Sequence, residues 1–189
     1  LAQQQALKEF RSRLGEITGL RRDIPDFTVR MGLATGEVVL GTVGSDISKS
    51  YTVIGDIVNT ASRLEGVNKV FGTRIVVSDE TAHLAQHAVK TRELDLIKVV
   101  GKAEPVRVHQ LVCKTADYTA ELTVLADTFA AGLAAYRAQD WHTATHHFSE
   151  CLALQPSDGP SQLFLTRIAF LKDNPPEQDW AGIWDFGVK

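Results

Sequence analysis

One run of fifteen residues, Tyr51–Glu65, most constrains how this chain can fold. Its first four residues alternate and favour β-structure, and Gly55 ends that pattern. Asp56 is a favourable helix N-cap, because its carboxylate can accept hydrogen bonds from the free N–H groups of a first turn. Apolar residues then recur at helical spacing on one stripe: Ile57, Ala61 and Leu64. The run therefore predicts a strand, a tight break and a helix.

A second stripe of the same predicted helix carries Asn59 and Arg63, whose side chains leave the helix in the same direction because they are four residues apart. An amide beside a guanidinium suits a cluster of anionic oxygens such as a triphosphate, since Arg is permanently charged and offers a planar fork to phosphate oxygens. A positive charge there would stabilise nucleotidyl transfer. The structural alternative is that Arg63 pairs with Glu65 or Asp79 and that Asn59 is only solvated.

Together with its lead-in, this run resembles the second half of a class III nucleotidyl cyclase domain. The lead-in reads Arg30 to Val39 and is followed by Gly41 and Gly44; the family shows an Arg-x-Gly-aliphatic-x-x-Gly strand turn there. The family then has a Tyr-x-x-x-Gly-x-x-Val-Asn-x-Ala-x-Arg-aliphatic segment. The positions that fit it are Tyr51, Gly55, Val58, Asn59, Ala61, Arg63 and Leu64. The resemblance runs from about residue 1 to about residue 114.

The resemblance implies an activity and roles for three residues. It implies a purine nucleotide cyclase that converts ATP to 3′,5′-cyclic AMP and pyrophosphate in intracellular signalling. Asn59 would orient the ribose, Arg63 would contact the phosphates in the transition state, and Thr52 would read the base edge. In bacterial relatives Thr at this place goes with adenine, which favours ATP over GTP. The alternative for Thr52 is a plain β-branched strand residue.

One position departs from the family pattern. The family often has a phosphate-binding Lys just before the Gly of its last hairpin turn, where this chain has Val100. Lys98 or Lys102 could substitute, since Lys reaches far as a point charge; the alternative is that both are solvated. The departure weakens the expectation of full catalytic strength. A second functional hypothesis is a catalytically degenerate cyclase-homology domain that acts as a dimerisation or nucleotide-sensing module, which missing metal-binding Asp residues upstream would favour.

The resemblance also implies two divalent ions, Mg²⁺ or Mn²⁺, and a homodimer. The family holds its ions with two Asp residues on the first part of the domain, which would precede Leu1, so we name no metal ligand here. Asp46, Asp56 and Asp95 are not candidates. The chain opens inside a helical pattern without an initiator Met, so we expect a piece of a longer protein that is inactive alone. A dimer would bring Asn59 and Arg63 opposite the partner's metal half.

Bulk properties are those of an ordinary globular chain. A net charge of −3 over 189 residues gives no reason to expect nucleic-acid or membrane binding, and no apolar run approaches the length of a membrane span. Cys113 and Cys151 lack metal-like spacing and fit free thiols in a reducing compartment, so we expect a cytoplasmic protein.

Strand and helix patterns alternate along the first part of the chain. Helices are predicted at about 1–17, 56–71 and 79–87, and strands at 27–33, 36–43, 50–54, 73–77, 91–100 and 105–112. Gly72 is expected to end the second helix and Ser78 to cap the third. We expect the 50–54 strand to complete one side of the sheet. The pattern predicts an α+β sandwich with helices on a sheet, which agrees with the ferredoxin-like core of the resembled family, here partial and lacking its first strands.

From about residue 115 the composition becomes Ala-rich and helical, which predicts two domains, 1–114 and 115–189. Helices are expected from about Thr119, after an N-cap at Asp140 and at 162–172. The segment resembles one tetratricopeptide repeat at Gly132, Ala144, Phe148 and Pro156. A single repeat cannot bury its own face, so we expect the helices to pack on the cyclase core or on a neighbour. The alternative is an interaction protein led by this tail.

Two side-chain groups of the tail need separate interpretation. Trp180 and Trp184 are expected to pin the C-terminal end by burial. His142, His146 and His147, with Glu150 one turn on, are interpreted as a solvated helix face rather than a zinc site.

Overall fold

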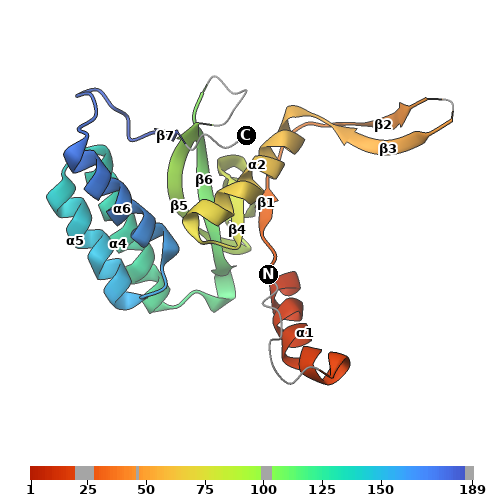
Figure 1. Cartoon of the computed structure of the whole chain (residues 1–189), viewed down its shortest axis with the longest axis horizontal. Helices are drawn as coiled ribbons and strands as arrows, with labels where there is room; N and C mark the ends of the chain where they lie inside the picture. Colours follow the sequence, from red (N-terminus) through yellow and green to blue (C-terminus); the bar gives the residue numbers. More distant parts are fainter. Residues whose placement is uncertain (20–27, 46, 99–103, 186–189) are drawn as a thin grey trace.

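The computed structural model describes residues 1–19, 28–45, 47–98 and 104–185. Its elements, in chain order, are shown in Figure 1. They are α1 (Ala2–Thr18), β1 (Met31–Leu33), β2 (Val39–Gly44), β3 (Lys49–Ile54), α2 (Asp56–Phe71), β4 (Ile75–Ser78), α3 (Asp79–Ala85), β5 (Val89–Lys98), β6 (Val106–Lys114), a 3-10 turn (Thr115–Asp117), α4 (Ala120–Arg137), α5 (Trp141–Leu154), α6 (Gly159–Asp173) and β7 (Trp184–Asp185).

A mixed five-stranded sheet in the order β1-β4-β6-β5-β7 forms the centre of the molecule. The β1–β4 and β5–β7 pairs are parallel, whereas β6 is antiparallel to both β4 and β5. Helix α2 packs against β1 and β4, and α4 contacts β5. The predicted α+β class, with helices on a sheet, is therefore confirmed.

Strands β2 and β3 form a separate two-stranded hairpin, with Val39 opposite Ile54 and Gly44 opposite Lys49. The expectation that the 50–54 strand, here β3, completes one side of the main sheet is therefore wrong. In the described residues the two strands pair only with each other. Figure 1 shows the β2–β3 hairpin extending away from the sheet, with α4–α6 on the opposite side.

Helix α2 lies unusually close to β1 at Gly32. A Cβ built on Gly32 would overlap the Ala61 carbonyl oxygen and the Glu65 amide nitrogen, and would lie 2.9 Å from the Leu64 carbonyl carbon. Only glycine permits such an approach of two backbones. The contact brings Leu64 into the core, where its side chain is 0% exposed.

The ends of α2 confirm one prediction and correct another. Gly72 ends the helix as predicted, in the left-handed conformation at φ 66°. The N-cap residue is Gly55, however, so the prediction of Asp56 as the N-cap is wrong. Asp56 is instead the first helical residue, where a carboxylate still interacts favourably with the helix dipole.

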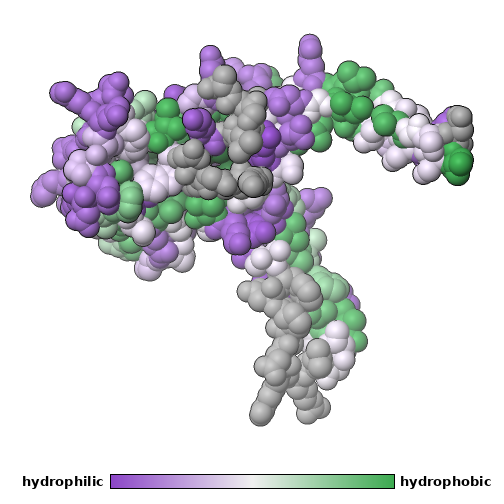
Figure 2. Space-filling model, turned by 45° about the horizontal axis from the view of Figure 1, so that its top comes forward, coloured by the Kyte–Doolittle hydropathy of each residue, from purple (hydrophilic) through white to green (hydrophobic). Residues whose placement is uncertain are grey.

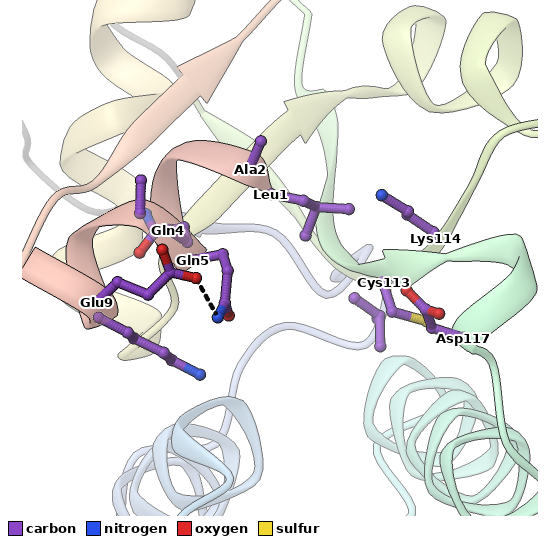
Figure 3. Close-up of a pocket in the computed structure, with 11 residues that line it drawn as sticks. Leu1, Ala2, Gln4, Gln5, Glu9, Cys113, Lys114 and Asp117 are labelled. Atoms are coloured by element: carbon purple, nitrogen blue, oxygen red, sulfur yellow. Dashed lines mark hydrogen bonds between the residues drawn. The ribbon is translucent and has the colours of Figure 1, made fainter.

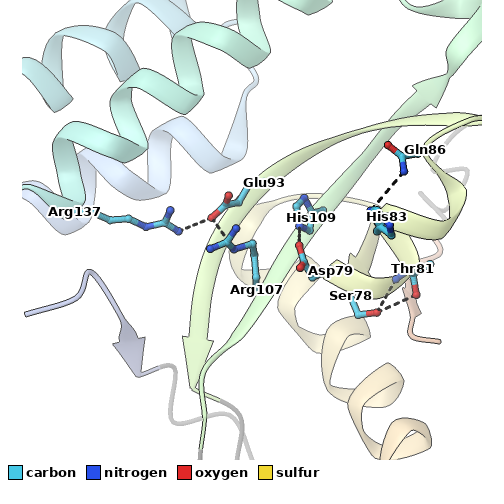
Figure 4. Close-up of polar contacts among 9 residues, drawn as sticks. All are labelled: Ser78, Asp79, Thr81, His83, Gln86, Glu93, Arg107, His109 and Arg137. Atoms are coloured by element: carbon cyan, nitrogen blue, oxygen red, sulfur yellow. Dashed lines mark hydrogen bonds and ion pairs between the residues drawn. The ribbon is translucent and has the colours of Figure 1, made fainter. Parts of the chain in front are cut away.

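Helices α3, α4, α5 and α6 each begin at a side-chain cap. Ser78 accepts a hydrogen bond from the Thr81 N–H at 3.3 Å (Figure 4), and Asp140 accepts one from the Thr143 N–H at 3.0 Å, both as predicted. Helix α6 begins at Gly159, three residues before the predicted start, because Asp158 caps it and Pro160 is tolerated in a first turn.

Helices α4–α6 share one hydrophobic core with α2 and the sheet. Phe129, Phe148 and Phe164 pack together in that core, and Phe164 also contacts Phe71 of α2. The expected packing of the tail on the first part of the chain is confirmed. The domain division at residue 114 and the likeness to a tetratricopeptide repeat stay predictions.

Two further findings concern the helices and the cysteines. None of the helices in the described ranges is both long enough and apolar enough to cross a bilayer. Cys113 and Cys151 are both free thiols, and Cys151 is buried.

We expect Gly32→Ala to lower the free energy of unfolding by about 1–3 kcal/mol or more, because the added methyl group must push α2 away from β1. Gly41→Ala is the matched control, since an added Cβ there meets nothing within 4 Å, and its effect should stay within about 0.5 kcal/mol. Denaturant unfolding of both variants measures this. Equal stabilities would contradict the close approach.

Candidate functional site

The β3–α2 connection presents three predicted site residues on consecutive elements. Thr52 lies on β3 opposite Gly41 and is half-buried. Asn59 and Arg63 lie one turn apart on α2; Asn59 is exposed and Arg63 is half-buried. Gly55 joins the two elements tightly, since an added Cβ there would lie 3.1 Å from the Glu37 carbonyl oxygen.

Within the described part of the chain, neither Asn59 nor Arg63 makes a hydrogen bond or ion pair. The acids that could have paired with Arg63 have other partners. Glu65 accepts from Arg30 at 2.8 Å, and Asp79 contacts His109 at 2.6 Å (Figure 4). The alternative in which Glu65 or Asp79 neutralises Arg63 is therefore not realised, and Arg63 is left available to a ligand.

The two predicted lysines lie elsewhere. Lys98 is exposed at the end of β5, which β6 and β4 separate from β1 in the sheet. Lys102, like Val100, falls outside the described residues. The structure thus groups Thr52, Asn59 and Arg63 on neighbouring elements, and places Lys98 on a different strand.

The family assignment follows from comparison with known sequences. A sequence model of the family described as "Adenylate and Guanylate cyclase catalytic domain" matches residues 4–113, more than half of the chain. This chain belongs to that family.

Known cyclases are similar to this cyclase domain over part of their length. Adenylate cyclase 1 of Rhizobium meliloti (strain 1021) is 38% identical over 89 residues, which are 47% of this chain and 13% of that protein. Adenylate cyclase of Anabaena cylindrica is 35% identical over 111 residues, 57% of this chain and 22% of that protein. The chain therefore spans less than a quarter of the length of these curated relatives.

One solved structure supports the fold directly. The crystal structure of the adenylyl cyclase CyaB from P. aeruginosa has a TM-score of 0.51 and 30% sequence identity to this cyclase domain. The match covers 62% of this chain and 57% of that chain.

Asn68 of α2, which the sequence analysis did not single out, holds this helix on the sheet through buried hydrogen bonds. Asn68 is 0% exposed, and its amide nitrogen donates to the carbonyl oxygens of Met31 at 2.9 Å and Leu64 at 3.0 Å. Its side-chain oxygen accepts from the Thr73 hydroxyl at 3.0 Å. The sequence could have indicated this role. Asn68 continues the apolar stripe of α2, and a buried amide at such a position must form hydrogen bonds.

The cavity nearest the start of the chain is a poor candidate for catalysis. A cavity of about 570 Å³ opens between the first turns of α1 and the end of β6 (Figure 3). It is lined by none of the predicted site residues. Burial raises the pKa of its Cys113 thiol, with Asp117 adding to the shift, so this thiol stays protonated at neutral pH and is a weak nucleophile.

One buried carboxyl with a shifted pKa lies under the tail helices rather than on the site helix α2. Burial raises the pKa of the Asp95 carboxyl, and the adjacent Arg167 opposes that shift. Across the described ranges no group of three or more His, Cys, Asp or Glu side chains could hold a metal ion. His146 and His147 instead lie 3.4 and 3.1 Å from Glu150 on the surface of α5.

We expect Asn68→Ala to lower the free energy of unfolding by about 1–3 kcal/mol, because it leaves buried partners in β1 and before β4 unsatisfied. Ser62→Ala, an exposed position on the same helix, is the control and should be nearly neutral. Thermal or denaturant unfolding measures both. A neutral Asn68→Ala would show that the amide does not hold α2 on the sheet.

Proposed function

We propose that this chain carries the nucleotide half-site of a purine nucleotide cyclase that converts ATP to 3′,5′-cyclic AMP and pyrophosphate. The observation that carries the proposal is the pair Asn59 and Arg63, side by side on α2 and without partners among the described residues. An accessible guanidinium without a counter-ion can donate its hydrogen bonds to an anionic ligand. Membership of the cyclase family supplies the class of that anion.

The chemistry assigns each side chain a different task. The ribose 3′ oxygen forms a bond to the α-phosphorus, and the bond from that phosphorus to the pyrophosphate oxygen breaks. Negative charge accumulates on the phosphate oxygens, where Arg63 would donate charge-assisted hydrogen bonds. Asn59 would hold the ribose so that its 3′ oxygen lies in line with the leaving group.

Thr52 would meet the base at the other end of the nucleotide. It lies half-buried on β3, three residues before the Gly55 turn into α2, so the base and phosphate contacts would come from one continuous segment. Its hydroxyl can donate or accept a hydrogen bond, which supports ATP as the substrate.

Members of this family use divalent metal ions, which supply charge neutralisation at the phosphates. The described residues offer no carboxylate cluster that fits such ions. The residues of this chain are therefore proposed to supply nucleotide binding, orientation and charge stabilisation, and none of them is given the role of a metal ligand.

The cyclase is proposed to act as a homodimer, and the β2–β3 hairpin supports this. Large apolar side chains are exposed along it, among them Val39, Leu40, Val43, Ile47 and Tyr51, with Ile47 at 98% and Tyr51 at 72%. Figure 2 shows hydrophobic residues gathered on this arm. Contiguous apolar surface of this kind marks an interaction site, and a two-fold dimer would cover two such arms at once.

The degenerate regulatory module remains the second candidate, because Val100 occupies the position where the family often has a phosphate-binding Lys. That module would still bind nucleotide or dimerise, but it would not convert ATP to cyclic AMP. Turnover measurements on the full-length protein distinguish the two.

We expect Arg63→Ala in the full-length protein to reduce kcat for cyclic AMP formation with Mn²⁺ by about 10²–10³-fold, the effect of removing a donor that stabilises developing charge. Lys69→Ala is the control, because Lys69 is an exposed cation on the same helix. Equal turnover by Arg63→Ala and the unchanged protein would remove Arg63 from the mechanism.

We expect Thr52→Val to reduce the preference for ATP over GTP, because it keeps the β-branched shape and removes only the hydroxyl. The loss of one hydrogen bond predicts a change of about tenfold in the ratio of the two kcat/KM values. Steady-state kinetics with both nucleotides measures it. An unchanged ratio would identify Thr52 as a plain strand residue.

A further inference from the structure

The last turn of α2 meets the first residue of α6 backbone to backbone. A Cβ built on Gly159 would overlap the Phe71 carbonyl oxygen and would lie 3.1 Å from the Gly72 Cα atom. In the same way, a Cβ on Gly72 would lie 3.4 Å from the Gly159 Cα atom. Glycine permits this approach because it has no side chain to separate the backbones. The tail therefore touches the helix of Asn59 and Arg63 directly.

Side chains of α6 reinforce this junction through Phe71, the last residue of α2, which is 0% exposed. The Phe71 ring lies 6.4 Å from the ring of Phe164, measured between centroids. The guanidinium of Arg167, three residues further along α6, lies 5.5 Å from the same ring. The end of α2 therefore rests on α6 through both backbone and side-chain contacts.

The start of α6 is itself fixed on the sheet by Asp158, the residue before Gly159. One Asp158 carboxylate oxygen accepts from the Ser161 N–H at 3.2 Å and from the Ser161 hydroxyl at 2.6 Å. The other accepts from Arg92 of β5 at 2.7 Å, and Arg92 also donates to Gln110 of β6 at 2.6 Å. Asp158 is 2% exposed and Arg92 is 5% exposed. Gly159 cannot move away from α2 without disturbing this buried ion pair, and a broken buried pair leaves an uncompensated charge.

We propose that α6 is a positioning element of the cyclase: Gly159 sets the direction of α2, and so the place of Asn59 and Arg63 at the nucleotide. This inference rests on the proposed function. Two backbone contacts then locate α2, one with β1 at Gly32 and one with α6 at Gly159, and two points define the direction of a rigid rod. Figure 1 shows α2 leading from the β2–β3 hairpin towards the tail helices.

A displacement at the end of α2 reaches the proposed site because both lie on one continuous helix. Arg63 precedes Phe71 by about two turns, which is about 12 Å along the helix axis. A misplacement of about 1 Å at reacting groups can lower a rate by about 10²-fold. The predicted consequence is slower chemistry rather than weaker substrate binding, because Arg63 is proposed to contact the phosphates in the transition state.

The test compares Gly159→Ala with Gly132→Ala in the full-length protein, assayed well below the melting temperatures of both variants. The methyl group added at Gly159 meets the end of α2, whereas at Gly132 it would lie 2.9 Å from the Phe148 ring of α5. We expect Gly159→Ala to lower kcat for cyclic AMP formation with Mn²⁺ by about 10–10²-fold and to leave KM for ATP within about twofold. Gly132→Ala should lower the melting temperature and leave both constants within about twofold.

A double variant with Arg63→Ala tests whether Gly159 acts through the site helix. Gly159→Ala should lower kcat by no more than about threefold once Arg63 is absent, because a guanidinium that has been removed cannot be misplaced. An equal loss in both backgrounds would overturn the positioning role, as would an unchanged kcat in Gly159→Ala alone. Both of these results leave the proposed function intact, whereas a full-length protein that neither binds nor cyclises ATP would overturn both.

A second variant keeps the test decisive if Gly159→Ala does not fold. Phe71→Leu keeps an apolar side chain at the end of α2 and removes the ring that contacts Phe164 and Arg167. It should lower kcat in the unchanged background more than in the Arg63→Ala background, and equal losses in the two backgrounds would again overturn the positioning role.

Discussion

The close approach of helix α2 to strand β1 is the contact on which the arrangement of this cyclase domain depends. Gly32 leaves room for the backbone at Ala61 and Glu65, and Asn68 then ties the far end of the helix to β1 with buried hydrogen bonds. Once these backbones touch, the rotation of α2 is fixed. Leu64 must face the core, and Asn59 and Arg63 must lie away from it. The orientation of Asn59 and Arg63 therefore depends on the absence of a side chain at Gly32.

The tail adds a second kind of constraint, made of buried charge. Arg92 of β5 donates to Asp158 at the start of α6 at 2.7 Å, and Arg167 of α6 donates to Asp95 of β5 at 2.6 Å. The two pairs run in opposite directions between the same two elements, so sliding or reversing α6 on β5 would bring like charges together. Such pairs contribute specificity more than net stability. Apolar packing around Phe129, Phe148 and Phe164 stabilises the docking of the tail helices on the sheet. The charged pairs determine the position of α6 along β5.

Local signals predicted much of this structure. The bounds of α2, the Gly72 stop, the caps at Ser78 and Asp140 and the shared face of Asn59 and Arg63 all follow from residues a few positions apart. The docking of the tail could not be predicted in the same way, because its pairs join residues 66 and 72 positions apart and helical periodicity carries no information on such partners. The separate β2–β3 hairpin was missed for a related reason, since alternation predicts a strand but not the strand it pairs with.

The central claim is that α2 presents Asn59 and Arg63 to a bound nucleotide, and a crystal structure of the full-length protein with Mn²⁺ and a non-cyclisable ATP analogue tests it most directly. The account predicts that the Arg63 guanidinium lies within about 3.2 Å of a phosphate oxygen and that the Asn59 amide faces the ribose. An analogue bound elsewhere, with both side chains in solvent and α2 still seated on Gly32, would contradict it.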